Sequence, residues 1–338
     1  MPRPLPRLEL ICPAGTLPAL QAAVDSGADH VYFGLRDNTN ARNFAGLNFD
    51  TESAASGVRY AHDRGVGVLL AINTYPQPGA WTRWTDAVDT AARLGIDAII
   101  VADPGLMQYV ARRHPNLALH LSVQGSATNY EAINFYHRHF NIRRAVLPRV
   151  LSVAQIAGVI RGTPVEIEAF GFGSLCVMVE GRCALSSYVT GESPNMNGAC
   201  SPAPYVRWDM KPDGLESRLN GVLINKYGAE ERAAYPTLCK GRYEVDGAQY
   251  YAIEEPASLN ALALLPELAR VGVKAIKIEG RQRSPAYVAA VTRVWRRAID
   301  ACAKHGSAFT VNAVWLNQLL SLSEGTQQTL GAYYRPWK

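Results

Sequence analysis

Short apolar segments alternate with amphipathic, helix-like segments along most of this chain. We predict strands at residues 8–12, 30–35, 66–73, 98–103, 117–124, 144–150, 164–170 and 275–280. A helix between consecutive strands brings them into parallel pairing, and eight such units can close into a barrel. The sequence therefore predicts an α/β fold, a TIM-like (β/α)₈ barrel.

A long interruption separates predicted strands seven and eight. It covers residues 171–255 and is rich in glycine and cysteine. We expect the barrel to span residues 8–305, with a flexible N-terminal tail at 1–7 and a C-terminal extension at 306–338 packed on the barrel. Active sites of such barrels form from loops at the C-terminal ends of the strands, and the loop after strand seven is one of them.

The composition is that of a folded globular protein. Hydrophobic residues make up 48% and charged residues 19% of the chain, which supplies a large core. The net charge of +5 is scattered, which favours a solvated surface over a nucleic-acid footprint. MPRPLPR does not begin a signal peptide, and no segment approaches the roughly 18 apolar residues of a membrane span. We expect a cytoplasmic protein with reduced thiols.

Four of the six cysteines fall within the interruption. They are Cys176, Cys183, Cys200 and Cys239. Four thiolates suit either zinc or an iron–sulfur cluster, but the C-x₂-C pair usual in structural zinc sites is absent. The C-x₃-C-x₂-C spacing of radical enzymes is absent as well. The residues alone therefore leave zinc, a cluster and unligated thiols open, whereas Cys12 and Cys302 are expected to be buried thiols.

Polar side chains share one face of several predicted strands. They include His120 and Gln124, Glu166 and Glu168, and Lys277, Glu279 and Arg281. The opposite faces are apolar and should meet the helices, so the polar faces should point into the barrel. Two interpretations remain: a ligand site at the strand ends, or a salt-bridged plug in which Glu168 pairs with Lys277 or Arg149.

The segment from Glu168 to Ser186 carries the pattern E-x-F-x-x-G-S-L-C-x₄-G-x-C-x-L-S. This pattern resembles the signature of the collagenase-like peptidases, family U32. The resemblance continues through residues 38–49, 122–140, 188–203, 235–243 and 277–288. Two departures are Gly125, where alanine is expected, and a longer N-terminal tail.

The resemblance implies a function other than proteolysis. Members of this family are associated with oxygen-independent hydroxylation, of RNA bases in some and of the ubiquinone ring in others. It implies a [4Fe–4S] cluster on Cys176, Cys183, Cys200 and Cys239, a heterodimer with a homologous protein, and prephenate as oxygen donor. Neither H-E-x-x-H nor G-x-S-x-G occurs in the chain, so a peptidase is the weaker alternative.

Candidate substrate-binding residues follow predicted strands or lie in the motif loops. The arginines, whose fork suits carboxylates, are Arg42, Arg149, Arg182 and Arg281. The others are Asn73, Gln124, Glu168 and Glu279. The structural alternative is that the arginines pair with Glu168 and Glu279 and only close the barrel. Two further alternatives are a non-catalytic scaffold that carries a cluster and RNA-base hydroxylation, although residues 306–338 are shorter than a typical RNA-binding domain.

Overall fold

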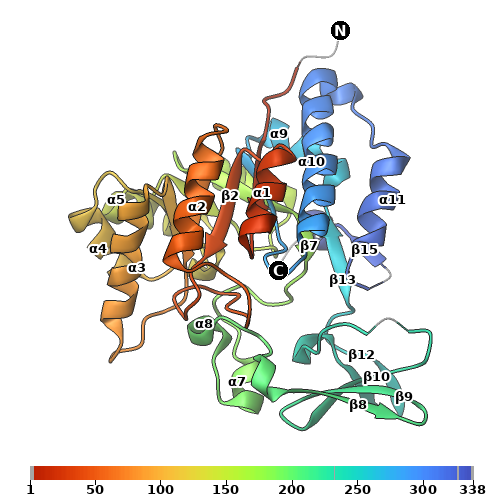
Figure 1. Ribbon diagram of the computed structural model, residues 1–338. Coiled ribbons are helices and arrows are strands. Elements are labelled where there is room, and N and C mark those ends of the chain that lie inside the picture. The colour runs from red at the N-terminus through yellow and green to blue at the C-terminus, as the bar shows by residue number, and fades with distance from the viewer. Residues whose placement is uncertain (1–3, 232, 326, 336–338) are drawn as a thin grey trace.

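The computed structural model describes residues 4–231, 233–325 and 327–335. Its centre is a closed barrel of parallel strands (Figure 1). The strands are β1 (Glu9–Pro13), β2 (His30–Gly34), β3 (Gly67–Ile72), β4 (Ala98–Val101), β5 (Ala118–Leu121), β6 (Arg144–Val146), β7 (Glu166–Ser174) and β14 (Ala275–Ile278). Strand β14 pairs in parallel with both β1 and β7, which closes the ring. The predicted (β/α)₈ barrel is confirmed.

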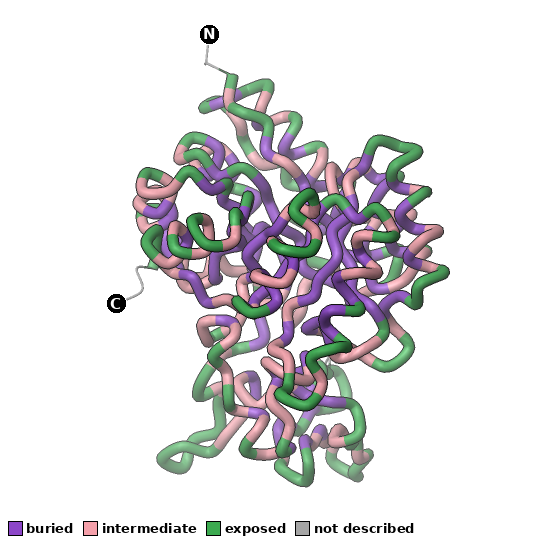
Figure 2. Tube along the Cα trace, turned by 90° about the vertical axis from the view of Figure 1, so that its left-hand side faces the viewer, coloured by how far each residue is buried: buried purple, intermediate pink, exposed green. Residues whose placement is uncertain are grey.

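Helices surround the barrel and connect its strands. They are α1 (Leu17–Asp25), α2 (Thr51–His62), α3 (Trp81–Leu94), α4 (Pro104–Arg113), α5 (Tyr130–Phe140), α6 (Val153–Arg161), α9 (Leu265–Val271) and α10 (Pro285–His305). Polar N-caps fix where several begin: Asp50, Asp103 and Ser152 each accept a hydrogen bond from a backbone N–H in the first turn. Figure 2 shows buried segments concentrated in the interior of the molecule, and barrel strands such as β3, β4 and β14 are almost entirely buried.

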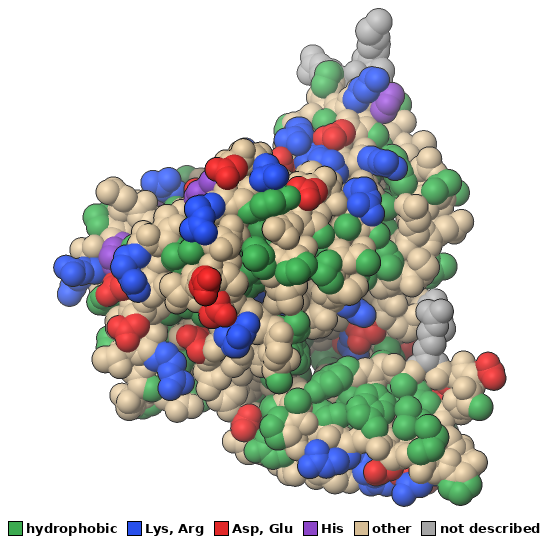
Figure 3. Space-filling model, viewed as in Figure 1, with side chains coloured by type: hydrophobic (Ala, Val, Ile, Leu, Met, Phe, Trp, Pro, Cys, Tyr) green, Lys and Arg blue, Asp and Glu red, His purple; other side chains and the backbone are tan. Residues whose placement is uncertain are grey.

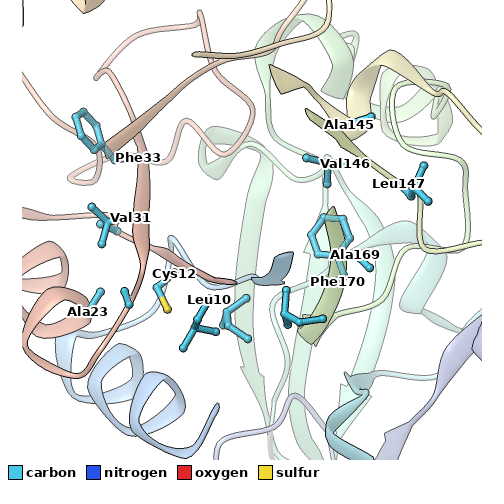
Figure 4. Packing of buried hydrophobic residues seen from close by; sticks show 14 of the residues in the cluster. Leu10, Cys12, Ala23, Val31, Phe33, Ala145, Val146, Leu147, Ala169 and Phe170 are labelled. Carbon is cyan, nitrogen blue, oxygen red and sulfur yellow. The ribbon is translucent and has the colours of Figure 1, made fainter. Parts of the chain in front are cut away.

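Strand alternation separates two hydrophobic clusters. The larger lies between strands and helices and includes Leu10, Cys12 and Val31 (Figure 4). The smaller lies on the opposite strand faces and includes Ile11 and Tyr32. Because successive side chains of a strand point to opposite sides, the apolar faces meet the helices, as predicted.

Strand β7 is longer than the sequence indicated. The prediction ended it at Phe170, since the glycines that follow suggested a turn. The strand continues to Ser174, because residues 172–174 pair antiparallel with β13 (Ala257–Asn260), which the sequence did not reveal. Gly173 has a φ of 128°, which glycine adopts freely. The chain therefore leaves the barrel sheet after residue 174.

The segment between β7 and β13 forms a separate layer, seen below the barrel in Figure 1. We call residues 175–256 the insertion. It contains α7 (Leu185–Thr190), α8 (Pro194–Asn197), β8 (Val206–Lys211), β9 (Gly214–Leu219), β10 (Val222–Tyr227), β11 (Arg242–Val245) and β12 (Ala248–Tyr251). Strands β8–β10 make an antiparallel sheet, and β11 and β12 make a hairpin.

Described segments near both termini contact the barrel. The C-terminal segment contains α11 (Ala313–Ser321) and β15 (Gln327–Thr329), and β15 pairs with β13. At the other end, the Arg7 side chain binds Asp29 and Asp300, while residues 1–3 of the predicted tail lie outside the described residues. Among the helices that the structure describes, none has the length and apolar character needed to cross a bilayer.

Candidate functional site

The insertion contacts the loops that follow the barrel strands. The hydroxyl of Ser126, after β5, donates to the carbonyl of Glu180 at 2.6 Å. The backbone N–H of Arg42, after β2, donates to the carbonyl of Gly198 at 2.6 Å. After β3, the N–H of Tyr75 donates to the carbonyl of Asn195 at 3.2 Å. These contacts hold the cysteine-bearing loops over the C-terminal mouth of the barrel.

Two glycines make this close approach possible. A Cβ on Gly181 would lie 1.9 Å from the carbonyl oxygen of Gln124, and one on Gly198 would lie 2.6 Å from that of Asn40. Both glycines also have positive φ, 86° and 80°. Any other residue would clash with backbone and adopt a strained conformation. The glycines that flank the cysteines in the sequence therefore bring the insertion against the mouth.

Four cysteines of the insertion lie near one another. Cys176, Cys183, Cys200 and Cys239 are free and half-buried, whereas Cys12 and Cys302 are buried in the barrel layer. Burial raises the pKa of Cys176 and Cys239 to about 12, and negative charge on Cys200 adds to both shifts. Burial, with a contribution from Cys200, also raises the pKa of Cys183. Cys200 thus lies within electrostatic reach of the other three thiols.

The four thiols fit the donor set of an iron–sulfur cluster in their chemistry. Backbone N–H groups of Met178 and Leu185 donate to Cys176 and Cys183, the kind of bond that tunes cluster sulfurs. Within the described residues, however, no group of three or more His, Cys, Asp or Glu side chains is already arranged to hold a metal ion. The loops of the insertion bring the four thiols into one region of the molecule, but they do not place them as the ligands of a metal ion.

Beside the cysteines, two arginines and two buried glutamates form an ion-pair cluster. Glu279, directly after β14, accepts from Arg42 at 2.9 Å and from Arg149 at 2.6 Å. Burial opposes its ionisation, but Arg149 and Arg42 lower the pKa of Glu279 to about 2. Arg149 also pairs with Glu180 of the insertion and stacks on Phe170, 3.6 Å from the ring centroid. Arg149 thereby joins the insertion to the barrel.

Arg281 is buried at the same mouth but is paired differently. Its side chain is 5% exposed, and its Nη1 donates to the amide oxygen of Asn40 at 2.9 Å. No carboxylate of the described residues forms an ion pair with it. Burial lowers the pKa of Arg281 to about 10. Of the four predicted arginines, Arg42 and Arg149 are thus paired with glutamates and Arg281 is not.

The remaining candidates have different surroundings. Asn73 accepts from the N–H of Ala41 at 2.9 Å and donates to Ser122 at 3.0 Å, so it ties two mouth loops together. Gln124 is half-buried, and its Oε1 has no hydrogen-bond partner among the described residues. Arg182 is exposed and forms no ion pair within the described part of the chain.

Glu168 lies deeper in the barrel than the mouth cluster. Its Oε1 accepts from the ammonium of Lys277 at 2.7 Å, and Arg144 approaches its Oε2 at 3.8 Å. The Lys277 ammonium also lies 3.9 Å from the ring centroid of Tyr32. Burial lowers the pKa of Lys277, although Glu168 opposes that shift. The predicted ion pair between Glu168 and Lys277 is present inside the barrel. Arg149, the other predicted partner of Glu168, pairs with Glu180 and Glu279 instead.

Three residues of the mouth were not singled out from the sequence. Glu180 and Asn40 lie within the family motifs, in VEGRC and NTNAR, and only folding shows that they meet Arg149 and Arg281. Lys240, next to Cys239, pairs with Glu324 at 3.1 Å and ties the cysteine loop to the C-terminal segment. Lys240 could be noticed only as a neighbour of a cysteine, because its partner lies 84 positions away.

Comparisons with known proteins identify the family. The model of peptidase family U32 matches residues 15–335. The chain belongs to peptidase family U32. It is 31% identical over 319 residues to the tRNA hydroxylation protein P1 of Bacillus subtilis, covering 92% of this chain and 67% of that protein.

Other U32 relatives carry different names. The tRNA hydroxylation protein P of Escherichia coli K12 is 32% identical over 316 residues, which cover 86% of this chain and 68% of that protein. A protein named collagenase, from Porphyromonas gingivalis, is 31% identical over 306 residues, covering 87% and 66%. The chain thus spans about two thirds of the length of these relatives. The resemblance recognised in the sequence is confirmed at the level of the family.

Proposed function

We propose that this protein is an iron–sulfur subunit of an oxygen-independent hydroxylase that acts on the ring of a ubiquinone precursor. Within the U32 family, its motifs most resemble those of the ubiquinone biosynthesis protein UbiU. The names of two relatives, which refer to tRNA hydroxylation, support hydroxylation as the reaction class. A cytoplasmic location remains a prediction from the sequence.

The observation that carries the proposal is the convergence of the cysteines beside a charged barrel mouth. Cys176 lies within electrostatic reach of Arg149, and Arg42 within reach of Cys176 and Cys200. Four thiolates and an inorganic core would bring negative charge to this place, and these two cations would stabilise it. A peptidase would instead require an activated nucleophile or a metal-bound water.

The cofactor would be a [4Fe–4S] cluster held by Cys176, Cys183, Cys200 and Cys239. When bound, it would supply one-electron redox chemistry and would tie together segments of the insertion that are distant in the sequence. The mouth residues of the barrel would hold the reactants. Arginine forks suit the carboxylates of an oxygen donor such as prephenate, and the buried surroundings exclude water.

A homologous UbiV-like protein is the proposed partner, in a heterodimer. The insertion exposes large apolar side chains, among them Met210, Trp208 and Tyr250, at 78%, 41% and 49% of their surface. Figure 3 shows apolar side chains gathered over the strands of the insertion. Clusters of this kind are typical of surfaces that a partner protein covers.

Hydroxylation of an RNA base is the second candidate function, because the names of the relatives refer to it. The basic residues are spread over the sequence without a dense run, which argues against an RNA footprint. The two functions differ in which molecule gains an oxygen atom. They can be separated in the cell without knowledge of the reaction's intermediates.

The test is a deletion of the gene in its own host, followed by growth without oxygen. We expect ubiquinone to fall and a precursor lacking a ring hydroxyl to accumulate, while hydroxylated tRNA and rRNA bases stay unchanged in mass spectra of RNA digests. A plasmid carrying the wild-type gene should restore ubiquinone, and one carrying Cys200→Ala should not. Normal ubiquinone together with loss of a hydroxylated RNA base would assign the second function instead.

A further inference from the structure

A hollow of about 440 Å³ lies at the N-terminal ends of the barrel strands, at the opposite end of the barrel from the mouth. The first residues of five strands line it: His30, Ala98, Ala118, Arg144 and Glu166. Active sites of such barrels form at the other end, and the N-terminal end ordinarily serves stability. The hollow is therefore separate from the site beside the cysteines.

Two buried side chains of this hollow carry polar atoms without a hydrogen-bond partner among the described residues. They are Nδ1 of His120, a residue 8% exposed, and Nη1 of Arg144, a residue 4% exposed. Nδ1 of His30 has no such partner in the described chain either. Behind them, Oε2 of Glu168 forms no hydrogen bond with a described residue and lies 3.8 Å from Nη1 of Arg144. Because buried polar groups are nearly always hydrogen-bonded, this gathering calls for a partner from outside the chain.

The charged groups around the hollow balance one another. Three cations and three carboxylates surround its inner end and are joined by ion pairs: Arg144, Lys274, Lys277, Glu9, Glu166 and Glu168. At the rim, Arg143 and Asp97 add one exposed charge of each sign. Burial, with Arg144 and Lys277, holds the pKa of His120 well below its usual value, so this ring is neutral near pH 7. An ion would upset the balance, whereas a neutral polar molecule would keep it.

The rest of the wall is apolar or aromatic. Its apolar residues are Leu69, Ala98, Ala118, Ile142, Pro164 and Val165. The ring of His137 is held in place, because its Nδ1 lies 2.9 Å from the carbonyl oxygen of Ile142. A Cβ on Gly67 would lie 2.4 Å from Cδ2 of His30, so glycine at that position leaves room for the second ring. A wall of this kind suits a flat apolar body with one polar end.

A ligand of this hollow needs a head group that both accepts and donates. Nη1 of Arg144 can only donate a hydrogen bond, whereas Nδ1 of a neutral imidazole can accept one. We propose that the hollow binds an uncharged aromatic carboxamide, whose amide oxygen accepts from Arg144 and whose amide N–H donates to His120. The inference goes beyond the proposed function and does not rest on it, because the cysteines lie at the other end of the barrel.

The experiment measures binding by calorimetry to the full-length wild-type protein purified without oxygen. The probes are benzamide, benzoate and benzamidine, which share a ring and a flat head group but are neutral, negative and positive. We expect saturable binding of benzamide and binding of the two ions that is at least roughly tenfold weaker, because each ion would bring an unbalanced charge into the hollow.

Two variants place the bound molecule in the hollow. Ala118→Leu fills the hollow without removing a charged or polar group, and should abolish benzamide binding. His120→Phe keeps a ring of similar size but loses both nitrogens, and should weaken benzamide binding by roughly tenfold. Ala308→Leu, at an exposed position outside this hollow, is the matched control for Ala118→Leu and should bind like the wild type. Melting temperatures of all three variants should stay close to that of the wild type.

Several results would overturn the inference. Absence of saturable benzamide binding would mean that the hollow holds only water, and equal binding of the three probes would mean that charge balance does not select the ligand. Unchanged benzamide binding in folded Ala118→Leu would place the bound molecule elsewhere. If Ala118→Leu fails to fold, His120→Phe decides, and benzamide binding as tight as in the wild type would contradict the proposed contact.

Discussion

The barrel buries a continuous hydrophobic core between its strands and helices, whereas the insertion buries very little. Among the described residues of 175–256, the buried hydrophobic side chains are Ala199, Leu219, Ile224 and Tyr227. Small units with so little core usually need a metal site, disulfides or a partner to stay folded. The cysteines of the insertion are all free. The comparison indicates that the barrel is stabilised by burial, whereas the insertion has to rely on its contacts with the barrel and, if the proposal is right, on the bound cluster.

The largest effect should come from removing a cluster ligand. In Cys200→Ala we expect iron to fall from about four per chain to near zero, because one of the four proposed ligands is lost. Amide hydrogen exchange should then rise throughout residues 175–256 and stay unchanged in the barrel strands, because only the insertion depends on the cofactor. The same result is expected for Cys176, Cys183 and Cys239.

Cys302→Ala is the control, since Cys302 is buried against the barrel and lies away from the insertion. It should keep its iron and its slow exchange in the insertion. Equal loss of iron in Cys302→Ala and in the four insertion variants would contradict the ligand assignment. Unchanged exchange in an iron-free Cys200 variant would show that the insertion folds without the cofactor.

The next largest effect concerns the ion pairs at the contact between the barrel and the insertion. Glu279→Gln leaves Arg42 and Arg149 without the carboxylate that both contact, and removing one partner from a buried ion pair costs about 3–5 kcal/mol. The free energy of unfolding, measured with urea, should fall by that amount. Glu230→Gln, at an exposed position, should change it by less than about 0.5 kcal/mol. Similar losses of unfolding free energy in both variants would show that the ion pairs of Glu279 do not stabilise the protein.

A smaller effect depends on pH and arises in the barrel. Burial, with Arg144 and Lys277, holds the pKa of His120 well below its usual value. The unfolded chain binds this proton more readily, so stability should decrease as the pH falls below about 6.5, by up to about 1.4 kcal/mol per pH unit. His120→Gln should flatten the pH dependence, and the exposed His139→Gln should not. An unchanged slope in His120→Gln would mean that His120 is charged when folded.

The smallest effect tests the packing of the C-terminal segment. The hydroxyl of Tyr333 donates to the carbonyl of Phe170, and both residues are buried. Tyr333→Phe should lower the free energy of unfolding by about 1 kcal/mol, because that carbonyl loses its partner. The neighbouring Tyr334 is 61% exposed, and Tyr334→Phe should have almost no effect. Equal effects of the two substitutions would contradict the packing seen here.

Hydrophobic periodicity made the barrel predictable, whereas the signals for elements outside it are weaker. Each barrel strand is an apolar segment of ordinary length, and alternation on β5, β7 and β14 showed which faces carry charge. The antiparallel partner β13 was missed because A-S-L-N is short and only partly apolar. The extension of β7 was missed because its ladder is formed with β13, a segment distant in the sequence.

The sequence was enough to predict which residues lie at the candidate site, but not which of them pair with one another. Strand ends located Arg149, Arg281 and Glu279, since such barrels place their sites there, and a motif loop located Arg42. Sequence could not show that Glu279 binds two of the arginines while Arg281 forms no ion pair with any described residue, because the partners lie on different loops. Glu168 was grouped with the mouth residues, yet it pairs with Lys277 within the barrel.

The metal and sulfide content of the wild-type protein purified without oxygen tests the proposed cluster most simply. We expect a brown protein with about four iron atoms and four sulfides per chain, with the absorption of a [4Fe–4S] cluster. Iron should be lost in proportion when any of the four insertion cysteines is replaced. A colourless protein with one zinc per chain, or with no metal and a fully folded insertion, would contradict a [4Fe–4S] cluster on these cysteines.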